Sequence, residues 1–275
     1  MLQTFNRISS AVFDLVLAPF GHGPLAAAVD LTLWPALMGV LAIGVYKLVS
    51  NQKALLRVKS QISMRLLEIR LFSHDILQVL RSTGWILLKN TVYLGNHMLP
   101  MAVMIGPFVV ILAQLVAHYG YEPVEPGRVE VLHVRLDPDA GVPASQVSLA
   151  LPAGVALDAP PVKTADHRAF FRLRAETPGD HVLRVAVGDA VFEKGWAVGG
   201  LARKVPAKRL RGLEALLYPG ELALPADGPV EAIELAVPAR PLGFLPDGEL
   251  GIVLWTLVVS LAAGFAVKGL FGVTI

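Results

Sequence analysis

The 275-residue sequence contains no cysteine, which excludes a disulfide framework, a thiolate metal site and a cysteine nucleophile. Charged residues are scarce as well, at 17% of the chain, whereas soluble domains carry about 25%. Hydrophobic residues make up 54% of the chain and the mean hydropathy is +0.58. This balance indicates a membrane protein.

The sequence also lacks the spacings that mark catalytic and metal sites. Its seven histidines show no HExxH or related pattern, and neither a nucleophile elbow nor a phosphate-cradling glycine loop is present. We therefore expect a protein that is not an enzyme and that binds no metal or cofactor.

Three apolar runs are long enough to cross a hydrocarbon core of about 30 Å. They cover residues 31–49, 98–117 and 250–270. Ahead of them, residues 1–20 place apolar side chains at helical spacing opposite Asn, Ser and Asp, which predicts an amphipathic helix in the outer membrane interface. The lipid bilayer is thus the first expected partner.

The loop between the first two runs contains seven basic residues and only two acidic ones, Glu68 and Asp75. The basic residues are Lys53, Arg57, Lys59, Arg65, Arg70, Arg81 and Lys89. Because short loops rich in Lys and Arg stay in the cytoplasm, we expect this loop and the C-terminus to be cytoplasmic. The N-terminus and residues 118–249 are then outside, and a bacterial inner (plasma) membrane is the expected location.

Within this loop, apolar residues at helical spacing predict an antiparallel helical hairpin over residues 50–97. The stripes expected to seal its two arms are Val58, Ile62, Leu66, Ile69 and Phe72, and Ile76, Leu80, Leu87 and Leu94. The basic residues either serve only as a positive-inside anchor, or they attract an anionic lipid surface or a ribosome. DNA is not an expected partner, because the arms lack interleaved exposed aromatic residues.

Residues 121–248 differ in composition, with short runs of alternating apolar and polar residues between turn clusters. Six or seven strands at this spacing predict an antiparallel β-sandwich that is immunoglobulin-like in outline. The expected fold class is therefore an α+β membrane protein, with three transmembrane helices, a cytoplasmic helical hairpin and an extracytoplasmic β-sandwich domain.

Polar residues next to the apolar runs are the best functional lead, because polar groups in hydrocarbon are costly and tend to face protein or water. The candidates are Lys47, Asn51, Gln52, Asn96 and Gln114. They predict a hydrophilic groove open to the cytoplasm, and Pro100 and Pro107 could free backbone groups into it. The alternative is that these residues only reach toward the interface and cap helices.

The predicted order of segments resembles that of the Oxa/YidC superfamily of membrane insertases. This order is an outer amphipathic helix, a span, a cytoplasmic hairpin and a return span. The segment NHMLPMAVMIGPF, residues 96–108, is similar to the start of the corresponding span in bacterial YidC proteins, although its second proline lies one residue later. The resemblance covers residues 1–117 and the last span and leaves the β-domain aside. It implies a polar groove for client segments, with Lys47 as its positive charge, and a hairpin that recruits clients or ribosomes.

Two kinds of function follow from these observations and are left open. The first is a YidC-like insertase or biogenesis factor that acts on nascent membrane proteins. The second is a non-catalytic scaffold or assembly subunit whose β-domain binds an extracytoplasmic protein partner.

Overall fold

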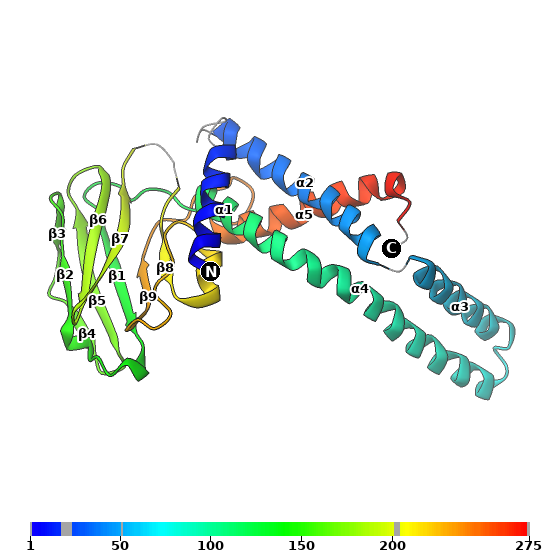
Figure 1. Cartoon of the computed structure of the whole chain (residues 1–275). Helices are drawn as coiled ribbons and strands as arrows, with labels where there is room; N and C mark the ends of the chain where they lie inside the picture. Colours follow the sequence, from blue (N-terminus) through cyan, green and yellow to red (C-terminus); the bar gives the residue numbers. More distant parts are fainter. Residues whose placement is uncertain (1, 18–23, 51, 201–203, 274–275) are drawn as a thin grey trace. The chain divides into compact units, whose positions relative to one another are not determined.

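The computed structural model describes residues 2–17, 24–50, 52–200 and 204–273 (Figure 1). The chain divides into two compact units. The first, called here the sheet unit, comprises Met1–Thr32 and Val109–Thr256. The second, called the hairpin unit, comprises Leu33–Phe108 and Leu257–Ile275.

Among the described residues, three helices are long and apolar enough to cross a membrane, which agrees with the three apolar runs in the sequence. They are α2 (Pro24–Val49), α4 (Ile76–Tyr119) and α5 (Glu249–Phe271). Antiparallel sheets make up much of the remainder, so the chain belongs to the α+β class. Helix α2 begins seven residues before the expected start of the first span, because the alanine-rich segment ahead of that start is itself helical.

Helix α4 contains both the return arm of the hairpin and the second apolar run. It continues without interruption through Pro100 and Pro107. Its 44 residues correspond to about 66 Å at 1.5 Å per residue, roughly twice the thickness of a hydrocarbon core. A large part of α4 therefore extends beyond any bilayer that it crosses at an ordinary tilt.

The hairpin unit pairs α3 (Gln52–Leu71) with the first part of α4. Leu55 and Val58 of α3 are buried, and the Glu68 carboxylate accepts hydrogen bonds from Arg65 (2.7 Å) and from Ser82 of α4 (2.9 Å). Ser82 is completely buried. The two arms thus meet through the polar contact between Glu68 and the small side chain of Ser82.

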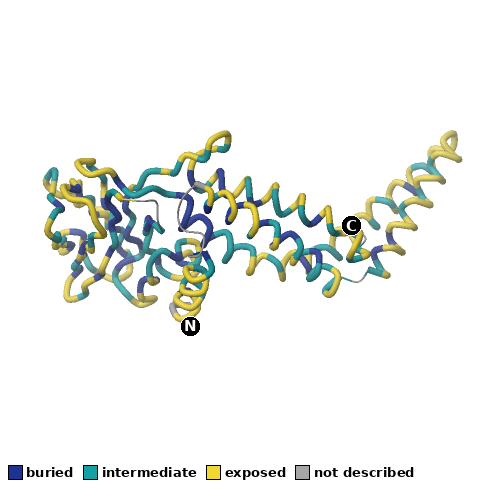
Figure 2. The backbone as a smooth tube through the Cα atoms, turned by 90° about the horizontal axis from the view of Figure 1, so that it is seen from above, coloured by how far each residue is buried: buried dark blue, intermediate teal, exposed yellow. Residues whose placement is uncertain are grey.

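The contact between the two arms differs from the expected stripes. Leu66, Leu80, Leu87 and Leu94 are all more than half exposed, so the prediction that they seal the arms was wrong. Instead, the completely buried Ser82 side chain lies at the contact between the arms and donates to Glu68. Figure 2 shows how much of these two helices is exposed.

Helices α2 and α5 pack closely through small residues within the hairpin unit. A Cβ atom added to Gly39 would overlap the carbonyl oxygen of Ser260, and one added to Gly264 would lie 3.2 Å from the Gly39 carbonyl oxygen. Close backbone approach at glycine is a common basis of helix association in membranes.

The sheet unit contains nine strands within its described residues. They are β1 (Val129–Leu136), β2 (Val147–Ala150), β3 (Val155–Leu157), β4 (Val162–Thr164), β5 (Arg168–Ala175), β6 (Gly179–Val187), β7 (Ala190–Val198), β8 (Lys208–Leu210) and β9 (Val230–Leu235). One sheet has the order β3-β5-β1-β9-β8, with β4 also paired to β5, and the other has the order β2-β6-β7. All seven strand pairings are antiparallel.

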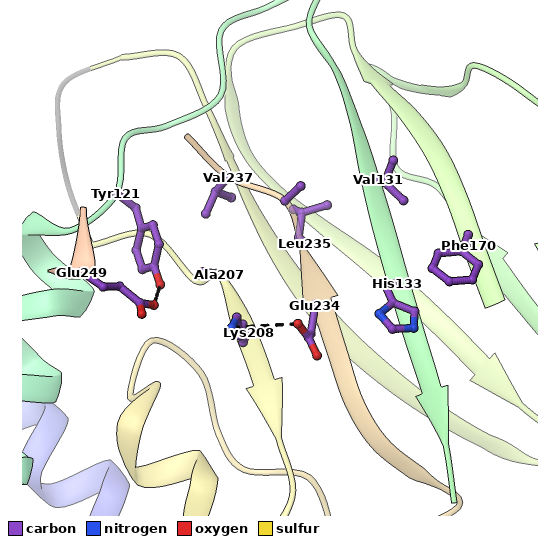
Figure 3. Close-up of a pocket in the computed structure, with 11 residues that line it drawn as sticks. Tyr121, Val131, His133, Phe170, Ala207, Lys208, Glu234, Leu235, Val237 and Glu249 are labelled. Carbon is purple, nitrogen blue, oxygen red and sulfur yellow. Dashed lines mark hydrogen bonds and ion pairs between the residues drawn. The ribbon is translucent and has the colours of Figure 1, made fainter. Parts of the chain in front are cut away.

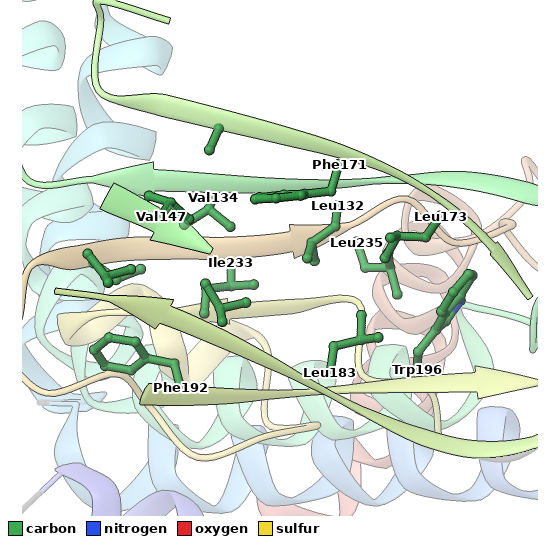
Figure 4. Packing of buried hydrophobic residues seen from close by; sticks show 14 of the residues in the cluster. Leu132, Val134, Val147, Phe171, Leu173, Leu183, Phe192, Trp196, Ile233 and Leu235 are labelled. Carbon is green, nitrogen blue, oxygen red and sulfur yellow. The ribbon is translucent and has the colours of Figure 1, made fainter. Parts of the chain in front are cut away.

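Alternation along the strands turns one face of each sheet toward a shared hydrophobic core (Figure 4). Leu132 of β1 lies opposite both Phe171 of β5 and Leu235 of β9, and all three are buried. Leu183 of β6 and Trp196 of β7 enter the same cluster from the other sheet. Each large apolar side chain buried in this way contributes about 1.5–3 kcal/mol, so the sheets are held mainly by this core.

Candidate functional site

A tyrosine–histidine contact joins α2 to α4 inside the hairpin unit. The Tyr46 hydroxyl lies 2.7 Å from Nδ1 of His97, and the two rings stack with their centroids 5.6 Å apart. The Tyr93 ring meets His97 edge-on at 4.6 Å. Because α2 and α4 are both candidate spans, this is a polar contact between two candidate spans.

The polar contact extends from Tyr46 into the start of the hairpin. The Tyr46 hydroxyl interacts with the Ser50 side chain, and the Ser50 hydroxyl accepts a hydrogen bond from the Gln52 amide. We call Tyr46, Ser50, Gln52, Tyr93 and His97 the span-end cluster. Each of these residues is partly buried.

The span-end cluster has capacity for a further hydrogen bond. Within the described chain, Nε2 of His97 is buried and has no hydrogen-bond partner. Polar groups at the edge of hydrocarbon are costly unless they are paired with protein or water. The cluster is therefore suited to hold water or the polar end of another segment.

The structure brings only one of the predicted groove residues into this cluster, namely Gln52. Lys47 follows Tyr46 directly but is exposed, and the Asn96 amide donates to the Val92 carbonyl of its own helix (3.0 Å). Gln114 is buried 18 residues further along α4, about 27 Å from Asn96 at helical rise. Asn51 lies outside the described residues.

The seven basic residues of the hairpin fall into two groups. Lys53, Arg57, Lys59, Arg70 and Arg81 are exposed. The other two lie beside the seam, where the Arg65 guanidinium and the Lys89 ammonium lie 5.7 and 5.2 Å from the centroid of the Trp85 ring. Such cation–π contacts hold a charged side chain in place, so five of the seven basic residues are presented to the surroundings.

A second polar group, which the sequence patterns did not predict, lies in the sheet unit. Asp30 of α2 is completely buried and its carboxylate accepts a hydrogen bond from the Tyr119 hydroxyl. The Arg240 guanidinium lies 5.8 Å from the Tyr119 ring centroid. A single acidic residue in the run AAAVDLTLW was the available signal, but the expected span began one residue after it.

Helix α1 (Leu2–Leu17) directs its polar face inward, toward the rest of the sheet unit. Asn6 donates to the Ala215 carbonyl and Ser10 to the Pro219 carbonyl. The Asp14 carboxylate lies 3.0 Å from Nε2 of His118 and 2.9 Å from the Lys204 ammonium. These contacts leave the apolar face of α1 exposed, at Phe5, Ile8, Val12 and Leu15.

Within the part of the chain that the structure describes, no three His, Cys, Asp or Glu residues are placed to hold a metal ion. Comparison with known proteins gives no match, since no protein-family model, no curated protein and no solved structure matches the chain.

Proposed function

We propose that this protein is a YidC-like insertase or biogenesis factor for membrane proteins. The observation that carries the proposal is the hydrogen bond between Tyr46 and His97. It places a partly buried polar cluster between two candidate spans, at the base of a hairpin with five exposed basic residues. The resemblance to the Oxa/YidC superfamily in segment order and in residues 96–108 adds to this support.

In this proposal the span-end cluster lowers the cost of bringing a polar client segment to the membrane edge. An unpaired polar group in hydrocarbon costs several kcal/mol (about 2–7), and hydrogen bonds from His97, Ser50 or Gln52 would offset part of that cost. The exposed basic residues of the hairpin would concentrate acidic clients, ribosomes or anionic lipid nearby. The protein would bind and orient the client without covalent chemistry.

The proposal includes a membrane orientation. The hairpin and the C-terminus lie in the cytoplasm, and the N-terminus and residues 118–249 lie outside a bacterial inner membrane, as the distribution of Lys and Arg predicts. The two sheets form a sandwich domain on the outer side. Reporter fusions after Ser73 should read cytoplasmic and fusions within residues 140–240 should read external; the reverse pattern would overturn this orientation.

The second candidate is a scaffold subunit whose sheet unit binds an extracytoplasmic protein. The observation in its favour is that the sheet unit has its own hydrophobic core, shared by both sheets. A stable partner that copurifies through residues 121–248, with no effect of hairpin variants on membrane-protein insertion, would favour the scaffold.

The insertase proposal is tested by reconstituting the purified protein in proteoliposomes and measuring insertion of a small single-span client. Tyr46→Phe and His97→Leu should each reduce the insertion rate about tenfold, as expected for the loss of hydrogen bonds worth about 1.4 kcal/mol. Thr91→Val is the matched control, because the Thr91 hydroxyl donates only within its own helix, to the Leu87 carbonyl (3.1 Å).

In the same assay, Lys47→Leu distinguishes the proposed span-end cluster from the groove charge that the resemblance to the Oxa/YidC superfamily implies for Lys47. If the span-end cluster acts as proposed, the exposed Lys47 contributes little and the variant inserts the client at nearly the normal rate. Full activity of both Tyr46→Phe and His97→Leu would contradict the proposed mechanism and leave the scaffold as the better account.

A further inference from the structure

The outer face of the larger sheet carries an unusual row of side chains, formed by residues that are direct cross-strand partners. His133 of β1 lies opposite Phe170 of β5 on one side and opposite Glu234 of β9 on the other. Glu234 in turn lies opposite Lys208 of β8. The row thus changes from charged to aromatic across four neighbouring strands.

A pocket of about 450 Å³ opens over this row (Figure 3). Val131, Leu235 and Val237 add apolar surface to it. Tyr121, which follows α4, and Glu249, the first residue of α5, lie on the other side of the pocket. The pocket therefore combines apolar walls with a small number of polar groups, as ligand sites commonly do.

The pocket contains two carboxylates and one ammonium group. The Lys208 ammonium lies 4.0 Å from the Glu234 carboxylate and 3.2 Å from the Tyr218 hydroxyl. The Glu249 carboxylate accepts a hydrogen bond from the Tyr121 hydroxyl, and its place in the first turn of α5 favours a negative charge. The pocket is left with one negative charge in excess.

The tyrosine and the histidine of the pocket are both neutral near pH 7. Burial, together with the bond to Glu249, raises the pKa of the Tyr121 phenol far above its ordinary value, so it remains a hydrogen-bond donor. Burial lowers the pKa of His133, whose ring stacks on Phe170 at 4.5 Å. Nε2 of His133 is buried and has no partner among the described residues.

We propose that this pocket binds a primary ammonium group carried on a short apolar chain. Glu249 and Glu234 bind the ammonium, the apolar walls cover the chain, and the unpaired nitrogen of His133 provides a further hydrogen bond. Because Glu249 begins a candidate membrane span, we place its carboxylate at the level of lipid headgroups. Two kinds of ligand carry such an ammonium group, namely a lipid with an ethanolamine headgroup and a free alkylamine.

The proposal is independent of the insertase function and can be tested on the full chain in phosphatidylcholine nanodiscs. Binding of hexylamine, hexanol and hexanoate is measured by calorimetry. Hexylamine should bind at least about tenfold more tightly than hexanol, since a hydrogen bond to a charged group contributes about 1.5–3 kcal/mol. Equal binding of hexylamine and hexanol would overturn the ammonium site and leave a merely apolar hollow.

Variants of the two carboxylates and of the lysine give a sharper test. Glu249→Gln should weaken hexylamine binding about tenfold or more, whereas Lys208→Met, which removes the competing cation, should strengthen it. Glu193→Gln is the matched control, because this carboxylate is 63% exposed and lies outside the pocket. Melting temperatures of each variant show whether the fold is kept, and equal effects of Glu249→Gln and Glu193→Gln would overturn the proposal.

Nanodiscs that contain phosphatidylethanolamine distinguish the two kinds of ligand. If this lipid competes with hexylamine in the wild type and the competition is lost in Glu249→Gln, the lipid headgroup is the ligand. Unchanged hexylamine affinity in these nanodiscs identifies a free amine instead, and both results support the ammonium site.

Discussion

The ammonium group of Lys194 lies 2.6 Å from the Glu221 carboxylate, and the lysine side chain is completely buried. The same ammonium donates to the carbonyls of Gly195 (3.0 Å) and Pro206 (2.6 Å), and Glu221 accepts the Gly195 N–H (2.6 Å). These bonds occupy polar groups on the outer edge of β7, which would otherwise invite pairing with another chain. The ion pair therefore covers the edge of β7 at Gly195.

Removing one member of this pair should destabilise the sheet unit strongly. Lys194→Met leaves Glu221 without its cation, and we expect it to lower the free energy of unfolding by about 3–5 kcal/mol. Denaturation followed by tryptophan fluorescence, to which the buried Trp196 contributes, measures this change. Lys163→Met is the control, since its exposed ammonium bonds only the Ser145 carbonyl; a loss as small as that of the control would contradict the structural role of the pair.

The ion pair between Asp137 and Arg211 should make the stability of the sheet unit depend on pH. The Arg211 guanidinium (2.6 Å) and the Asp139 N–H (2.9 Å) hold the pKa of Asp137 below its ordinary value of 3.8. A carboxyl whose pKa is lower in the folded state stabilises the fold above its unfolded pKa and loses that contribution as the pH falls through its folded pKa.

The measurement is the melting temperature of the wild type and of Asp137→Asn between about pH 7 and pH 2. The variant should be less stable at neutral pH, and the difference should shrink below pH 3.8 as Asp137 becomes protonated. Asp189→Asn, at an exposed turn, should show no such trend. A difference that persists unchanged to the lowest pH would mean that charge is not involved.

Gly39 should be essential for packing α2 against α5. A side chain at this position would overlap the Ser260 carbonyl oxygen, so Gly39→Val should cost about 1–3 kcal/mol or more through overpacking. Gly44→Val in the same helix is the control, because a Cβ atom there meets only the Phe271 ring at an ordinary 3.8 Å. Thermal stability in detergent compares the two variants, and equal melting temperatures would show that the two helices do not pack this way.

The exposed apolar face of α1 should lie in lipid. Because the chain contains no cysteine, single spin labels can be placed at Ile8→Cys, Leu15→Cys and, as an aqueous control, Asp189→Cys. Labels on α1 should be more accessible to oxygen than to a water-soluble nickel complex, since oxygen partitions into hydrocarbon, and the control should show the opposite. Aqueous behaviour of both α1 labels would contradict an interfacial helix.

The sequence by itself determined the features that depend on local composition and period. Apolar runs of about 20 residues predict spans because hydrocarbon excludes unpaired backbone, and period-two alternation predicts half-buried strands. Six alternating runs predict strands, and they coincide with β1, β2, β5, β6, β7 and β9. These runs are residues 128–136, 146–151, 168–174, 181–187, 190–198 and 230–237. The strands β3, β4 and β8 have only three residues each, too few for alternation to be recognised.

The tertiary structure decided what depends on contacts between distant segments. The period of the hairpin helices is compatible with several packing faces, and in the folded chain the arms meet at Ser82 and Glu68 while Leu80 and Leu87 are exposed. The predicted groove residues separated, because one continuous helix carries Asn96 and Gln114 about 27 Å apart. The pairings of Tyr46 with His97, Tyr119 with Asp30 and Lys194 with Glu221 join residues 51, 89 and 27 positions apart, a separation over which sequence periodicity carries no information.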